Sequence, residues 1–236
     1  MNVPVHIGII PDGNRRFAKR LVSQPWKGHS WGTEKIKEVF EWCRDAGIKI
    51  ITVYALSLEN LANRPKKEID YLLNLARKEA REVISNKSHF VHENRIRLSF
   101  FGRLELLPKD LQKDIAKARS ITKHYSNYFI NFAIAYGGRQ EIVEASRRIS
   151  EKIAKGVLEP GDVDEIVFRQ NLQTNGHPDP DLIIRTGGEK RLSNFLLFQS
   201  AYSELAFTDT YWPAITKKEF MSILRDFGKR ERRFGR

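Results

Sequence analysis

The chain has 236 residues, of which 41% are hydrophobic, so it can bury a substantial core and lacks the composition of a disordered protein. Its 41 lysines and arginines against 29 aspartates and glutamates leave a formal charge of +12, which predicts an anionic partner: a nucleic acid, an acidic lipid or a phosphorylated small molecule. The single cysteine, Cys43, excludes an intramolecular disulfide framework and every zinc motif built on cysteine pairs.

Short β-rich runs alternate with longer amphipathic runs along the chain, which is typical of βα units and a mainly parallel sheet. Residues 5–10 (VHIGII) predict a buried first strand, and residues 48–57 (IKIITVYALS) predict a second. Between them, an apolar pattern over residues 32–46 predicts a helix that Gly47 caps at its C-terminus. Pro65 then opens a longer helix with a pronounced apolar face.

The rest of the chain continues this alternation, apart from a stretch over residues 156–180 that is richer in turn residues. Further strands are predicted in residues 96–102, 128–138, 181–188 and 205–210, and helices over residues 65–85, 108–123, 140–155 and from about residue 216. We therefore expect an α/β fold in which a mainly parallel central sheet of about six strands is flanked by helices. No repeat or Pro/Gly-rich linker divides the chain, which favours one domain over residues 1–236.

Membrane-spanning and secretory segments are not apparent in the sequence. No apolar run reaches the roughly 20 residues that a membrane-crossing helix needs. The sequence MNVPVHIGII lacks the cationic segment and the small-residue cleavage site of a secretory signal. We therefore expect a soluble, cytoplasmic protein.

Polar or glycine-rich segments follow four of the predicted strands. They are PDGNRR (11–16), SLEN with NRP (57–65), YGGR (136–139) and RTGGEKRLSN (185–194). In a parallel sheet the carboxyl ends of all strands lie on one edge, where ligands bind. We therefore expect these four segments to converge on one site.

The segment after the first strand combines a carboxylate, a glycine and two arginines. Gly13 lets the backbone approach a ligand closely, and Arg16 can grip a phosphate with two hydrogen bonds. Asp12 offers an oxygen ligand to Mg²⁺, which takes one or two carboxylates together with substrate phosphates. The segment favours a diphosphate site, although Asp-Gly-Asn is also ordinary turn chemistry, in which Asp12 caps a helix and the arginines are solvated.

The segment after the fifth strand repeats these ingredients, with Arg185 and Arg191 flanking two glycines and Ser193 offering a hydroxyl. Two such segments at one sheet edge indicate two phosphorylated ligands or one long ligand. Arg64 and Arg139 could add charge to the same crevice. Solvated arginines are the alternative throughout, and for Arg139 a helix-start position without a ligand is the better interpretation.

Two further side chains are candidates on weaker grounds. His29 could hydrogen-bond a phosphate or relay a proton, but a lone histidine is more often structural. Glu204 is a candidate second metal ligand, but its spacing fits a solvated or ion-paired glutamate better. The apolar face of the helix after Pro65 is normally core, and beside diphosphate sites it would also suit a hydrocarbon ligand.

Five segments together resemble the cis-prenyltransferase family, of which undecaprenyl diphosphate synthase is the best-known member. They are HIGIIPDGNRRFAKR, GHSWGTEKI, YALSLENLANRP, YGGRQEIVEA and PDPDLIIRTGGEKRLSNFLLFQSAYSELAFTDTYWP, in the family's order over nearly the whole chain. The resemblance implies an α/β fold with an apolar tunnel and a homodimer. It also implies a Mg²⁺-dependent reaction that joins isopentenyl diphosphate to an allylic prenyl diphosphate and creates a Z double bond.

The resemblance further implies roles for individual residues. Asp12 would hold Mg²⁺ on a diphosphate, assisted by Glu204. The allylic diphosphate pocket would comprise Gly13, Asn14, Arg15, Arg16, His29 and Arg64, the isopentenyl diphosphate site Arg185, Arg191 and Ser193, and further substrate contacts Phe17, Ser57, Leu58, Glu59, Leu61 and Leu192.

The SLEN segment matches the family's catalytic loop, in which the asparagine is sometimes named as the proton acceptor. A neutral amide is a very weak base, so we expect Asn60 to orient the ligand while a diphosphate oxygen or water takes the proton. Phe17, Leu61, Pro25 and Lys190 depart from the common bacterial pattern. The sequence therefore leaves the prenyl acceptor and the product length open.

Three other interpretations fit parts of the sequence. A family member with a different acceptor would fit the resemblance, whereas a non-catalytic accessory subunit typically loses the aspartate and arginines that this chain keeps. Nucleic-acid binding would fit the charge, but no binding module or basic face with clustered aromatics is visible, so no nucleic-acid partner is expected. Peripheral contact with an anionic membrane is compatible with the charge, because a long prenyl product leaves into lipid.

Overall fold

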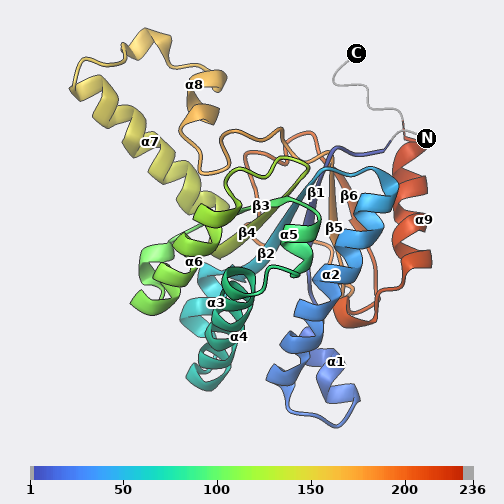
Figure 1. The fold of residues 1–236 in the computed structure, drawn as a ribbon. Coiled ribbons are helices and arrows are strands. Elements are labelled where there is room, and N and C mark those ends of the chain that lie inside the picture. The colour runs from blue at the N-terminus through green and yellow to red at the C-terminus, as the bar shows by residue number, and fades with distance from the viewer. Residues whose placement is uncertain (1–2, 231–236) are drawn as a thin grey trace.

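The structure, a computed structural model, describes residues 3–230. Six strands form one all-parallel sheet in the order β3-β4-β2-β1-β5-β6 (Figure 1). The strands are β1 (His6–Ile10), β2 (Ile50–Ser57), β3 (Ile96–Phe101), β4 (Tyr128–Tyr136), β5 (Leu182–Arg185) and β6 (Glu204–Phe207). The chain lays β2 on one side of β1 and β5 on the other, and ligands of open parallel sheets bind at such a switch point. The expected fold class is confirmed.

Helices surround this sheet in the described part of the chain. They are α1 (Asn14–Arg20), α2 (Gly28–Ala46), α3 (Leu58–Asn63), α4 (Lys66–Ser85), α5 (Phe90–Glu93), α6 (Lys109–Thr122), α7 (Gly138–Ala154), α8 (Glu165–Gln170) and α9 (Lys217–Gly228). None of the helices within residues 3–230 has the length and hydrophobicity of a membrane span.

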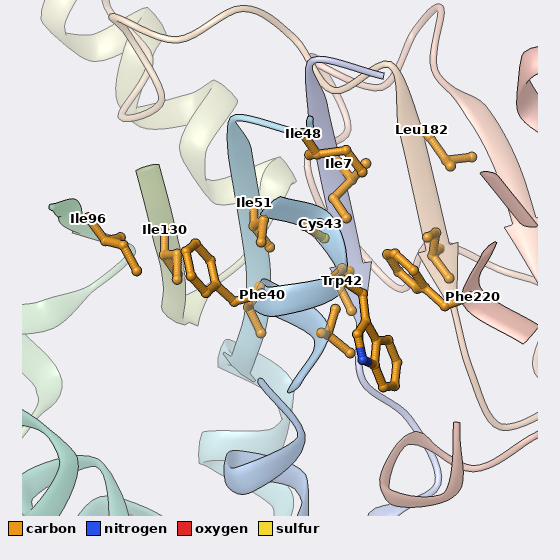
Figure 2. Packing of buried hydrophobic residues seen from close by; sticks show 14 of the residues in the cluster. Ile7, Phe40, Trp42, Cys43, Ile48, Ile51, Ile96, Ile130, Leu182 and Phe220 are labelled. Carbon is orange, nitrogen blue, oxygen red and sulfur yellow. The ribbon is translucent and has the colours of Figure 1, made fainter. Parts of the chain in front are cut away.

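The main core lies between the sheet and helices α2 and α9. Phe40, Trp42 and Cys43 of α2 pack on the strands, and Phe220 of α9 packs beside them (Figure 2). The opposite face of β1 is also buried, because a Cβ atom on Gly8 would lie only 3.1 Å from the Phe195 ring. Burial on both faces explains why the central strands are nearly continuous apolar runs.

The strands and the long helices lie where the sequence predicts them, within a few residues. Gly47 caps α2 in the left-handed conformation, as expected (φ 86°). The short helices α1, α3, α5 and α8 were not predicted, because segments of four to seven residues carry no useful periodicity. The first of these matters most, since α1 follows Asp12 and Gly13 directly.

Two glycines on α2 allow α1 to pack against it closely. A Cβ atom on Gly28 would lie 2.0 Å from the Asn14 carbonyl oxygen, and one on Gly32 would lie 2.5 Å from Asn14 Oδ1. The carbonyl of Gly32 also accepts a hydrogen bond from the Trp212 indole (2.8 Å). The position of α1 beside the sheet edge therefore depends on the absence of side chains at these two positions.

We predict that Gly28→Ala destabilises the protein by about 1–3 kcal/mol, because the added methyl group forces α1 away from α2. Denaturant unfolding measures the change. Gly161→Ala is the control, since a Cβ atom there meets nothing within 4 Å. Equal stability of the two variants would show that the close approach does not constrain α1.

Candidate active site

Asp12 and Arg185 meet at the carboxyl edge of the two central strands. Asp12 follows β1, and Arg185 is the last residue of the neighbouring strand β5, in register with Ile10. Arg185 Nη2 donates a hydrogen bond to Asp12 Oδ2 at 2.9 Å. The structure thus brings together two segments that are more than half the chain apart in sequence.

The Asp12 carboxylate is held in its ionised form. Burial alone would raise its pKa, but the hydrogen bond and charge of Arg185, the Gly13 amide and the charge of Arg16 together lower the pKa below its ordinary value. The Gly13 amide donates to Asp12 Oδ1 at 2.6 Å, and Arg16 Nη2 donates to the same oxygen at 3.2 Å. An ionised carboxylate beside a cavity is suited to binding a metal ion.

Asp12 lies in a polar pocket of about 300 Å³, hereafter the head pocket. Its lining comprises Pro11, Asp12, Gly13, Asn14, Arg15, Arg16, Lys19, His29 and Arg64. Among these lining residues Asp12 is the one acid, against four lysines and arginines. Gly13 turns the chain here in the left-handed conformation (φ 98°), and a Cβ atom on it would lie 2.5 Å from the Tyr211 ring. A cavity with this charge fits a diphosphate group.

A buried carboxylate that sequence reasoning missed holds the cationic side of the head pocket. Glu68, only 3% exposed, accepts a hydrogen bond from Arg64 at 2.9 Å and pairs with His29 at 3.1 Å. Arg15 lies 3.6 Å from its other oxygen. The spacing of Arg64 and Glu68, four residues apart on a helix start, was the available signal.

His29 is neutral at neutral pH in this environment. Burial lowers its pKa, and the nearby charges of Arg64 and Arg15 lower it further, while the hydrogen bond and charge of Glu68 raise it. The net pKa lies below the usual value of 6.5. His29 is therefore a hydrogen-bonding group here rather than a fixed cation.

An apolar tunnel of about 500 Å³ adjoins the head pocket. Both cavities are lined by Pro11, Asn14 and His29, so they lie side by side. The tunnel runs between α2 and α4 over the sheet, and its wall includes Leu72, Leu73, Ala76 and Phe132. Exposed residues of α2 and of the turn after α4, such as Lys37 and Asn86, line its far end, which is therefore open to solvent.

Residues of the loop after β5 form hydrogen bonds that connect the carboxyl ends of β1, β2, β4 and β5. Arg185 Nη1 donates to Ser193 Oγ at 2.7 Å, and Asn194 Nδ2 donates to Glu59 Oε1, after β2, at 2.8 Å. The amides of Gly138 and Arg139, after β4, donate to Asn194 O and Oδ1 at 2.7 and 2.8 Å. Asn194, which was not predicted, is thus the residue on which the segments converge.

The remaining predicted residues lie around these features. Arg185 is 5% exposed and already bound to Asp12, Arg191 O and Ser193, so it organises the site, and direct contact with a ligand stays a prediction. Exposed Arg191 pairs with Glu189 at 2.6 Å.

The other predicted substrate contacts have structural partners in the described chain. Ser57 caps α3 by accepting a hydrogen bond from the Asn60 amide, and Phe17 packs edge-on against Trp31. Leu58 and Leu61 pack beside α4, and Leu192 packs beside Phe195.

Glu204 does not join this site in the described chain. It begins β6 opposite Leu182, whereas Arg185, which contacts Asp12, lies opposite Phe207. Three residues of strand separate the two positions by about 10 Å. Glu204 instead pairs with Arg230. Its expected role as a second metal ligand beside Asp12 is therefore not supported within one chain. The pair with Arg230 agrees with the alternative given above, an ion-paired glutamate.

Comparisons with known proteins agree with this geometry. A family model described as putative undecaprenyl diphosphate synthase matches residues 10–235. Relatives from Methanopyrus kandleri and Pyrococcus furiosus are 51% and 48% identical over 99% of this chain and 85% and 88% of their own. Both are named tritrans,polycis-undecaprenyl-diphosphate synthase (geranylgeranyl-diphosphate specific).

Two solved structures share the fold over essentially their full length. Lavandulyl diphosphate synthase from Lavandula x intermedia, in complex with dimethylallyl diphosphate, superposes with a TM-score of 0.92 at 36% identity, covering 99% of both chains. A probable undecaprenyl diphosphate synthase from Campylobacter jejuni superposes with a TM-score of 0.81 at 34% identity, covering 100% of both chains.

We predict that the pKa of His29, followed by NMR titration, lies below 6.5 and falls further in Glu68→Gln, because the substitution removes the charge that favours the imidazolium. Glu59→Gln, which removes a carboxylate bonded to Asn194 instead, should leave the pKa of His29 unchanged. A pKa of His29 at or above 6.5 in the parent protein would contradict this description of the cluster.

Proposed function

The chain belongs to the undecaprenyl diphosphate synthase family of cis-prenyltransferases, and we propose that it condenses isopentenyl diphosphate with an allylic prenyl diphosphate to form a polyprenyl diphosphate with Z double bonds. One observation carries the proposal: a cationic head pocket adjoins an apolar tunnel, and the two share three lining residues. This is the shape of a molecule with a diphosphate head and a hydrocarbon tail.

We propose geranylgeranyl diphosphate as the allylic substrate and a longer polyprenyl diphosphate as the product. Several archaeal relatives carry that substrate in their names. An apolar cavity of about 150 Å³ holds one benzene, so a tunnel of about 500 Å³ corresponds to roughly 20 carbons, the size of a geranylgeranyl chain. The open far end of the tunnel would let a longer chain extend beyond it.

The arginines of the head pocket would provide most of the catalysis. Breaking the allylic C–O bond leaves negative charge on the departing diphosphate, and fixed cations stabilise that charge more in the transition state than in the substrate. Arg16 and Arg64 line the pocket, and Glu68 holds Arg64 in place. The apolar tunnel would exclude water from the allylic cation that develops.

Asp12 is the residue that would hold Mg²⁺. Its carboxylate is ionised and borders the head pocket, so the residue fits the ion. Residues 3–230 contain no cluster of three His, Cys, Asp or Glu side chains that could hold a metal alone, so diphosphate oxygens and water would supply the other ligands. When bound, the ion would neutralise charge on the departing diphosphate.

Carbon–carbon bond formation also requires the loss of one proton from the former isopentenyl unit. Ser57 fixes the turn of α3 on which Asn60 lies, through the Asn60 amide (3.0 Å). We propose that Asn60 orients the isopentenyl group there and that a diphosphate oxygen or water takes the proton, because an amide is too weak a base.

We also propose that two copies of the chain pair through α7 and α8. These helices project away from the sheet (Figure 1). Large apolar side chains are exposed along them and the connecting segment, including Val143, Val163 and Ile166. Burial of these side chains against a second copy would remove them from water.

The proposal is tested by incubating the purified chain with Mg²⁺, labelled isopentenyl diphosphate and a panel of allylic diphosphates, with product length read by mass and geometry by NMR. We expect Z products, and geranylgeranyl diphosphate used at least about tenfold more efficiently than dimethylallyl diphosphate, because its longer tail buries more apolar surface. Product formed from dimethylallyl diphosphate alone, or E double bonds, would contradict the proposal.

In the same assay Asp12→Asn should reduce turnover at least about 100-fold, since it removes the charge that binds Mg²⁺. Asp70→Asn is the control, because Asp70 is exposed on α4 and lines neither cavity. Full activity of Asp12→Asn, or activity that survives a chelator, would remove the metal from the proposal. No product with any substrate would point to the accessory-subunit alternative.

A further inference from the structure

Two large apolar side chains are exposed at the tip of the loop that joins α1 to α2. Val22 is 97% exposed, and Leu21 is 55% exposed. The loop that carries this pair, hereafter the apolar tip, lies at the bottom of the molecule in the view of Figure 1, between α1 and α2. Apolar side chains in such a position contribute nothing to the core of their own chain.

The backbone of the apolar tip is also in an unfavourable conformation for its sequence. Ser23 N donates to Ala18 O at 3.0 Å and Val22 N donates to Lys19 O at 3.1 Å, the pattern of a Schellman motif that ends α1. Val22 occupies the left-handed position of this motif (φ 53°), which glycine usually fills. A β-branched residue is strongly disfavoured there. Glycine would remove both the strain and the exposed methyl groups, so folding does not explain the valine.

The surroundings of the apolar tip are cationic and carry an interfacial aromatic ring. Residues 13–33 contain five lysines and arginines and no acid. Lys19, Arg20 and Lys27 lie close to the tip in sequence, although Arg20 also stacks on the Tyr211 ring (4.6 Å). Trp26 follows in the same loop, and Lys67 lies 4.9 Å from its ring centroid. An apolar tip, a tryptophan and basic side chains are the combination that anionic lipid surfaces bind.

We propose that the apolar tip inserts into the interface of an anionic lipid membrane, with the surrounding lysines and arginines on the headgroups. The same short helix α1 carries Arg15, Arg16 and Lys19 of the head pocket. Docking through the loop that follows α1 therefore brings the head pocket close to the lipid surface. Membrane docking does not rest on the proposed reaction, although a prenyl diphosphate is a molecule that would reach the pocket from there.

The test is co-sedimentation of the full chain with vesicles of phosphatidylglycerol and phosphatidylcholine in equal parts, and with vesicles of phosphatidylcholine alone. We expect binding to the anionic vesicles that weakens with salt. The double variant Leu21→Ser, Val22→Gly should bind about tenfold more weakly, since it removes two inserting side chains. Lys27→Glu should bind more weakly and with a shallower salt dependence.

Two controls separate docking from folding. Val22→Gly alone should keep or raise the melting temperature, because glycine relaxes the left-handed position. Leu106→Ser should bind like the parent, because it removes a similarly exposed leucine that follows β3, an edge strand separated from β1 by β4 and β2. The proposal is overturned if the parent does not bind anionic vesicles or if the double variant binds like the parent. It is equally overturned if the double variant changes the oligomeric state without vesicles, since a second copy would then cover the tip.

Discussion

The ion pair between Asp12 and Arg185 constrains the rest of the site. Arg185 is almost fully buried at the end of β5, and a buried guanidinium is costly unless its charge is paired. Its Nε atom has no hydrogen-bond partner in the described chain, so the pairing depends on the two terminal nitrogens. Asp12 satisfies one terminal nitrogen, and the loop that returns through Ser193 satisfies the other. Because Asn194 follows directly and binds the ends of β2 and β4, one buried arginine fixes four strand ends with respect to one another.

Different residues stabilise the charged head pocket and the apolar tunnel. In the head pocket, Glu68 offsets the mutual repulsion of Arg15 and Arg64 in the free protein. The tunnel wall comes from helix faces and strands that would otherwise form ordinary core. A bound diphosphate can accept hydrogen bonds from these arginines, and a hydrocarbon chain can make van der Waals contacts with the tunnel wall.

Sequence reasoning located the sheet edge but not the details that depend on register and side-chain contacts. The convergence of Asp12 and Arg185 follows from parallel topology, which hydrophobic periodicity reveals. Glu204 could not be placed, because a shift of three residues along β6 decides which sheet edge it occupies. Glu68 and Asn194 were missed because a carboxylate on a helix and an asparagine in a loop are common, and their importance lies in long-range partners. The strained Val22 was equally hidden, since its φ value is a property of the folded backbone.

We infer that a prenyl diphosphate binds with its head at Asp12 and its tail between α2 and α4. The most direct measurement is a crystal structure with Mg²⁺ and an unreactive thio analogue of geranylgeranyl diphosphate. We expect a diphosphate in contact with Arg16 and Arg64, a metal ion on the Asp12 carboxylate, and the tail along Leu72 and Phe132. A diphosphate bound away from Asp12, or a tail outside the tunnel, would contradict it.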